Sequence, residues 1–164
     1  MDSIRRLATP ILVIGLFLII LPVADFVGNV WPLRPGAADW RYGAIGILST
    51  FLLTPLLGLL LISISAYATE RRWLLRVVSI QSFSAAVALV LIVLAFTLDA
   101  LQVRQTRPIE DRWVTVVSFM LASAKHGLAT LCLLVLGVST MRAAKDFKAP
   151  DRTDRSANVV VGRS

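Results

Sequence analysis

Histidine and cysteine are almost absent from this chain of 164 residues, which contains one of each. The single cysteine, Cys132, excludes an intrachain disulfide because such a bond needs two thiols. The single histidine, His126, excludes a haem held by two histidines. Metal sites also need several His, Cys, Asp or Glu side chains that converge. The composition therefore predicts a protein without a metal centre.

Charge is scarce as well, since only 16% of the residues are charged and 57% are hydrophobic. The long apolar stretches contain no acid, which excludes an intramembrane aspartyl site with its two embedded carboxyl groups. Ion conduction would need polar groups at successive depths, and only one charge lies inside these stretches. A Ser-Lys dyad that uses Lys125 with Ser118 or with a serine of the third predicted helix stays open. Serines that mediate helix contacts explain the same pattern better, so we expect no enzyme.

The sequence does contain four long apolar stretches, each long enough to cross a bilayer core of about 30 Å as a helix of about 20 residues. They predict an all-α polytopic membrane protein with a single transmembrane domain, residues 1–141, of four antiparallel helices. The remaining residues, 142–164, are predicted to form a polar, basic cytoplasmic tail. The expected spans are about 7–27, 43–68, 77–98 and 113–140.

Lysine and arginine are unevenly distributed between the two predicted sides, with eleven on the side of the N-terminus and five on the other. Short loops rich in these residues stay in the cytoplasm. We therefore predict a bacterial inner (plasma) membrane protein with both termini cytoplasmic. Its basic surface should attract anionic lipids. No basic run is interleaved with aromatic residues on a folded platform, so nucleic acid is not an expected partner.

The loops between the predicted spans are short. The link 70–76 is brief enough to make the second and third helices antiparallel neighbours. The loop 25–41 contains two prolines and two glycines, which favour irregular structure. The loop 99–112 carries three arginines and three acids, which predicts a solvated turn with ion pairs.

Lys125 lies two residues from the midpoint of the fourth predicted span, about 3 Å along the helix axis. A charge there costs about 2.5–3.5 kcal/mol on insertion scales and usually faces a bundle interior, a cavity or a partner. A row of small and polar residues at intervals of four and three predicts that Lys125 faces other helices. This row consists of Ser118, Ala122, Lys125, Ala129 and Cys132.

The second predicted span offers acceptors at the depth of Lys125. Pro55 cannot donate a helical hydrogen bond, so the carbonyl of Phe51 is left free. We expect Lys125 to donate to the Phe51 carbonyl and the Thr54 hydroxyl, or else to an acid or ligand of another chain. The alternative is a lysine that only packs, extends toward the membrane surface, or is neutral in its apolar surroundings.

His126 follows Ala122 by four residues. The segment resembles the Ala-x-x-x-His pattern of bacterial light-harvesting polypeptides, which have one span rather than four. The resemblance implies a bacteriochlorophyll ligated by the His126 imidazole, with Ala122 leaving room for the ring. The favoured alternative is a histidine hydrogen-bonded to a neighbouring helix.

These features predict a non-enzymatic accessory subunit of a larger membrane complex, respiratory or photosynthetic, whose partners are other membrane protein subunits. Two other functions stay open. One is a small transporter or proton-linked carrier in which Lys125 and His126 line the path. The other is a pigment-binding protein that uses His126 and Ala122. The candidate ligands are bound lipid, chlorophyll or bacteriochlorophyll, and carotenoid.

Overall fold

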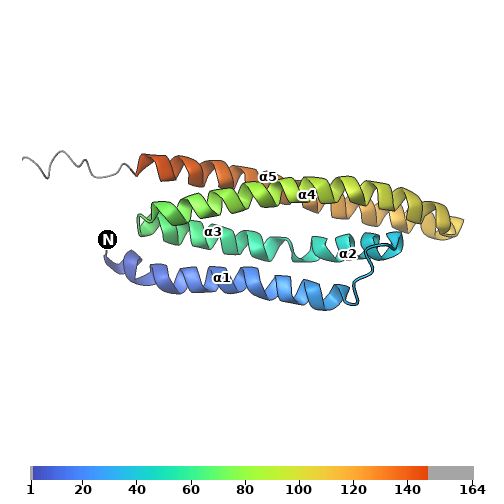
Figure 1. Ribbon diagram of the computed structural model, residues 1–164, viewed down its shortest axis with the longest axis horizontal. Helices are drawn as coiled ribbons and strands as arrows, with labels where there is room; N and C mark the ends of the chain where they lie inside the picture. Colours follow the sequence, from blue (N-terminus) through green and yellow to red (C-terminus); the bar gives the residue numbers. More distant parts are fainter. Residues whose placement is uncertain (1, 148–164) are drawn as a thin grey trace, which may run out of the picture.

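The computed structural model describes residues 2–147, and this part of the chain contains helices and no strands. The predicted all-α class is confirmed. Figure 1 shows elongated rods side by side, each running opposite to the rod before it, with α2 and α3 forming one rod. The elements are α1 (Asp2–Val30), α2 (Ala38–Phe51), α3 (Leu53–Ala68), α4 (Arg72–Thr106), the 3-10 turn η1 (Ile109–Asp111) and α5 (Arg112–Asp146).

Within residues 2–147, three helices are long and apolar enough to cross a membrane: α4, α5 and the part Leu7–Val30 of α1. A fourth span is obtained if α2 and α3 count as one. Both α4 and α5 have 35 residues, so each helix extends beyond the span predicted within it, 77–98 or 113–140. Charged residues bound those spans, and the helices continue past them because arginine and lysine are good helix formers. The predicted tail 142–164 begins inside α5, and 148–164 lies outside the described residues.

The second rod, which covers the span predicted over 43–68, is bent at its middle. The axes of α2 and α3 meet at 43°. Pro55 lies just past the bend and has no N–H for the helical hydrogen-bond ladder. The next bond, from the Leu56 N–H to the Leu52 carbonyl, is stretched to 3.4 Å. Leu52 itself keeps right-handed helical angles, so the rod bends without unwinding.

The turn between α3 and α4 reverses the chain within three residues. The Arg71 N–H donates to the Ala66 carbonyl at 3.0 Å and the Glu70 N–H to the Tyr67 carbonyl at 3.1 Å. These are the two bonds of a Schellman motif, which places the residue after the helix in the left-handed region. Glu70 occupies that position with φ 55°. The prediction that the second and third spans are antiparallel neighbours is confirmed.

Two glycines let α1 and α3 approach until their backbones touch. A Cβ atom added to Gly58 would lie 2.6 Å from the Gly15 carbonyl oxygen, and one added to Gly15 would lie 2.8 Å from the Gly58 oxygen. Nearer the start of α1, the Ser65 hydroxyl donates to the Ala8 carbonyl at 2.6 Å. Small residues allow such close packing between apolar helices. Among the described residues, α1 contacts α2 and α3 but neither α4 nor α5.

The other close pair is the hairpin of α4 and α5. The Ser79 hydroxyl on α4 donates to the Gly137 carbonyl on α5 at 2.9 Å, which fixes the register of the two helices. The central apolar core joins this hairpin to α3. Its buried residues are Leu59, Ile62, Val78, Ala86, Leu89, Ala129 and Leu133.

Candidate functional site

Lys125 is exposed on the surface of α5. The buried face of α5 includes Ala122, His126 and Ala129. Consecutive residues of a helix are turned by about 100°, so Lys125 points away from the side that His126 occupies. The prediction that Lys125 packs against the other helices of this chain is therefore wrong. Ser118 and Cys132, from the same predicted row, are exposed with it.

The predicted acceptors of Lys125 lie on the bent rod. Phe51 is the last residue of α2, Thr54 is in the first turn of α3, and both are half-buried. Between residues 2 and 147, no hydrogen bond or ion pair joins Lys125 to any other group. The structure thus does not bring this predicted set of residues together.

His126 has no exposed surface. Its Nδ1 atom lies 2.7 Å from the carbonyl oxygen of Ala122, one turn earlier in the same helix. A carbonyl can only accept, so Nδ1 is the donor in this contact. Nε2 is buried and has no hydrogen-bond partner among the described residues. The expected bond from His126 to a neighbouring helix is replaced by a bond within α5.

The bend in the second rod lies near the depth of His126. The Tyr42 hydroxyl donates to the Thr115 carbonyl at 2.9 Å, and α2 and α5 run in the same direction from this contact. His126 is eleven residues beyond Thr115, or about 16 Å along the helix. Along the second rod, eleven residues beyond Tyr42 is Leu53, the first residue after the bend.

A pigment does not fit the surroundings of His126. Ala122 and His126 share a buried face, with exposed fractions of 4% and 0%. That face is covered by the chain itself. A macrocycle ligated through Nε2 would need space that protein atoms already fill. Lys125 and His126 also have different surroundings, because Lys125 is exposed and His126 is buried.

Replacing His126 by leucine should leave the free energy of unfolding unchanged or raise it by about 1 kcal/mol, because the change removes an unpaired buried polar atom at similar volume. The variant His126→Ala should instead lower the free energy of unfolding by about 2–4 kcal/mol through the cavity it creates. Both are measured by SDS-induced unfolding in mixed micelles. Equal losses in the two variants would mean that Nε2 has a partner outside the described residues.

A buried ion pair joins α2 to α4, and the sequence did not predict it. Asp99 is only 3% exposed. Arg41 Nε donates to both oxygens of the Asp99 carboxylate, at 3.0 and 3.1 Å, and a second guanidinium nitrogen donates to Oδ1. The remaining nitrogen donates to the Pro35 carbonyl at 2.8 Å. The predicted solvated turn at 99–112 is therefore wrong at Asp99, because α4 continues to Thr106 and carries Asp99 inside the bundle.

Aromatic rings pack beside this ion pair. The rings of Tyr42 and Phe96 are stacked with centroids 5.0 Å apart, and Phe96 meets Phe119 at 5.2 Å. The Trp40 indole donates to the Val30 carbonyl at the end of α1, at 3.1 Å. Together with the Tyr42 hydroxyl bond to α5, these contacts hold four helices at this end of the bundle.

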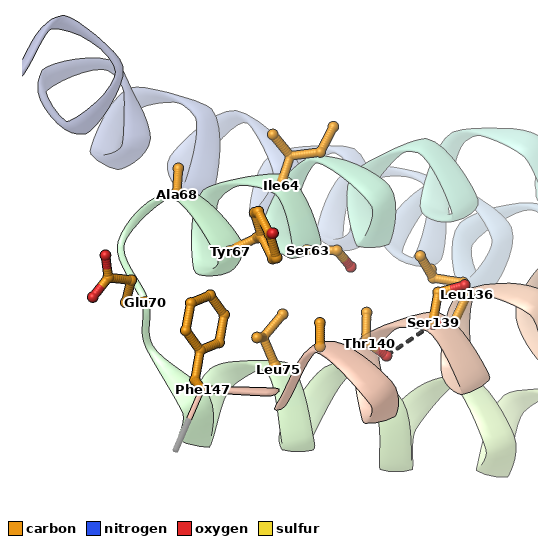
Figure 2. Close-up of a pocket in the computed structure, with 11 residues that line it drawn as sticks. Ser63, Ile64, Tyr67, Ala68, Glu70, Leu75, Leu136, Ser139, Thr140 and Phe147 are labelled. Atoms are coloured by element: carbon orange, nitrogen blue, oxygen red, sulfur yellow. Dashed lines mark hydrogen bonds between the residues drawn. The ribbon is translucent and has the colours of Figure 1, made fainter. Parts of the chain in front are cut away.

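The opposite end of the bundle contains a cavity of about 610 Å³ between α3 and α5. Figure 2 shows Tyr67 and Ser63 of α3 on one side of this cavity, with Phe147 and Thr140 on the other. The Tyr67 and Phe147 rings lie 5.3 Å apart. The Ser63 and Thr140 hydroxyls donate to carbonyls of their own helices, at 2.7 and 2.8 Å. The cavity is therefore suited to apolar groups.

Lys125 belongs to a regular exposed row, which we call the α5 stripe. Its members alternate at intervals of four and three residues, the spacing of a coiled-coil heptad. Every second member of the row is polar or small, and the members between them are apolar. The α5 stripe consists of Ser118, Lys125, Cys132 and Ser139, interleaved with Val114, Leu121, Leu128 and Val135, all exposed.

Among residues 2–147, no three His, Cys, Asp or Glu side chains are grouped so that they could hold a metal ion. Comparison of the chain with protein-family models, curated proteins and solved structures finds no match. The function must therefore be inferred from geometry and charge.

Proposed function

We propose that this chain is an integral membrane protein with four spans and acts as a non-enzymatic subunit of a larger membrane assembly. The apolar lengths of α1, α4 and α5, with α2 and α3 as one bent span, support the membrane location. The excess of lysine and arginine on the side of the two termini supports a cytoplasmic location for both ends, in a bacterial inner membrane.

The observation that carries the proposal is the exposed ammonium of Lys125. It lies in the middle of the apolar part of α5, and the described part of the chain offers it no hydrogen bond or ion pair. In lipid, this charge would cost about 2.5–3.5 kcal/mol on insertion scales. A second protein that covers this side of α5 removes the cost, because it shields the ammonium from acyl chains and offers it an acceptor.

A carrier function has less support. A path for a solute or proton needs polar groups that follow one another through the bundle. Several polar side chains inside the bundle are already bonded: Ser63 and Thr140 bond within their own helices, and Asp99 pairs with Arg41. His126 is enclosed, whereas Lys125, about 100° away around α5, is exposed.

Purification in a mild detergent tests the proposal. We expect the native chain, expressed in its own host at its natural level, to elute within a particle that contains other membrane proteins. Native mass spectrometry should release the chain from that particle in a fixed stoichiometry. A harsh detergent should reduce it to a single chain, which serves as the control. A single chain in the mild detergent as well would contradict the proposal.

A further inference from the structure

We infer that the α5 stripe binds a transmembrane helix of a different protein, and that this partner helix carries an aspartate or glutamate at the depth of Lys125. The inference rests on the proposed subunit function and names the chemistry of the partner. Three features carry it: the spacing of the stripe, the charge at its centre, and the cavity at its end.

The spacing of the α5 stripe fits a second helix. Residues that repeat at four and three positions form a straight seam when two helices cross at about 20° with a left-handed twist. Ser118 and Cys132 flank Lys125 at one heptad on either side, and both are small. Small residues in these positions let a partner backbone come close. The apolar members, such as Leu121 and Leu128, are then the knobs that fill its grooves.

Charge determines which helix can bind. A helix that covers Lys125 removes its ammonium from both water and the membrane surface. Burying this charge costs a large desolvation free energy unless an opposite charge pairs with it. A carboxylate on the partner supplies both the charge and the hydrogen-bond acceptor.

A second copy of this chain cannot supply that carboxylate. No acid occurs in any of its four apolar stretches, 7–24, 42–69, 77–98 and 113–141, so none lies at the depth of Lys125. Asp99, the acid buried inside the bundle, is held by Arg41. Two copies paired through the α5 stripe would also bring their lysines together, and like charges at one contact repel. The complement of Lys125 therefore belongs to another protein.

The cavity between α3 and α5 continues the same surface. Ser139, the last polar member of the stripe, lines this cavity together with Ser63 and Tyr67 of α3 (Figure 2). A helix that follows the stripe thus reaches a hollow lined mainly by apolar atoms, where its own apolar side chains can be buried. The cavity extends the contact beyond a single helix pair.

Cys132 is a natural reporter for this contact, because it is exposed, is the only cysteine of the chain and lies one heptad from Lys125. The test uses the purified full chain, reconstituted in liposomes with a designed membrane-spanning peptide of leucine and alanine. The peptide carries one central glutamate and one cysteine. Two versions place that cysteine one heptad before or after the glutamate, so that either peptide orientation brings it beside Cys132. Copper phenanthroline in air oxidises the two thiols to a disulfide.

We expect the glutamate peptide to cross-link to Cys132 about three- to thirtyfold more than the same peptide with glutamine, the range that polar contacts between membrane helices provide. The variant Lys125→Arg should keep this preference and Lys125→Met should lose it. A matched control exchanges two neighbours, Ala124→Lys with Lys125→Ala, which moves the charge by about 1.5 Å in depth but about 100° around the helix. Equal cross-linking by the two peptides, or a preference that survives the exchange, would overturn the inference.

The native particle separates this inference from the proposed function. If the wild-type chain elutes within a larger assembly and Lys125→Met leaves that assembly intact, the partner chemistry is wrong while the subunit function stands. If the wild-type chain is a single molecule in mild detergent, the subunit function fails, whatever the peptide shows. Loss of the assembly in Lys125→Met but not in Lys125→Arg supports both.

Discussion

Replacing Gly58 by valine should lower the free energy of unfolding by about 3 kcal/mol, at the upper end of the cost of overpacking. The reason is the contact with α1, where the first added carbon would lie 2.6 Å from the Gly15 carbonyl oxygen. A backbone carbonyl cannot swing aside as a side chain can, so the two helices must move apart. The measurement is SDS-induced unfolding followed by helical circular dichroism.

Other glycines of the chain provide the matched control. A Cβ atom added to Gly43 or Gly127 meets nothing within 4 Å. Alanine is the better helix former by about 1 kcal/mol, so Gly43→Ala and Gly127→Ala should be neutral or stabilising. The variant Gly58→Ala should fall between these controls and Gly58→Val. A neutral Gly58→Val would show that α1 does not pack against α3 in the way described.

Replacing Arg41 by methionine should give the other large loss of stability. The change leaves the Asp99 carboxylate, which is 5% exposed, without its cation. A buried charge without a partner is strongly destabilising, whereas apolar groups in place of the whole pair are often tolerated. We therefore expect Arg41→Met to be worse than Asp99→Asn, because the Arg41 side chain is 36% exposed and can still reach water.

The double variant Arg41→Met with Asp99→Leu tests whether the loss of stability comes from breaking the ion pair or from each substitution independently. It should recover most of the stability that Arg41→Met loses, as measured by the same SDS titration of the three variants side by side. Losses that simply add in the double variant would mean that the two side chains act independently.

The long apolar stretches made the number and direction of the rods predictable from the sequence. Two aspects of the fold were not predictable in this way. Charged residues marked the edges of the apolar segments, but α4 continues past Asp99 to Thr106, because nothing in 99–106 stops a helix. The contact of α1 with α3 depends on Gly15 and Gly58. Neither glycine stands out within its apolar stretch, so the sequence alone does not show that the two face each other.

The site was harder to predict because neighbouring faces of α5 look alike. Ala122 and Ala129 lie at helical spacing from both Lys125 and His126, so periodicity alone could not decide which of the two points inward. The structure selects His126. The pairing of Arg41 with Asp99, in contrast, could have been predicted from the positions of these residues in the sequence. Arg41 stands at the start of one apolar stretch and Asp99 at the end of the next, and antiparallel neighbours bring such positions together.

The limited contacts of α1 also bear on how the protein is made. A ribosome delivers the chain from its N-terminus, and segments can pair only once they have left the translocation machinery. Among the described residues, α1 packs on α2 and α3, and α4 packs chiefly on α5. The first half can therefore complete its packing before the second half is synthesised. The hairpin of α4 and α5 then packs against α2 and α3 after these have already associated with α1.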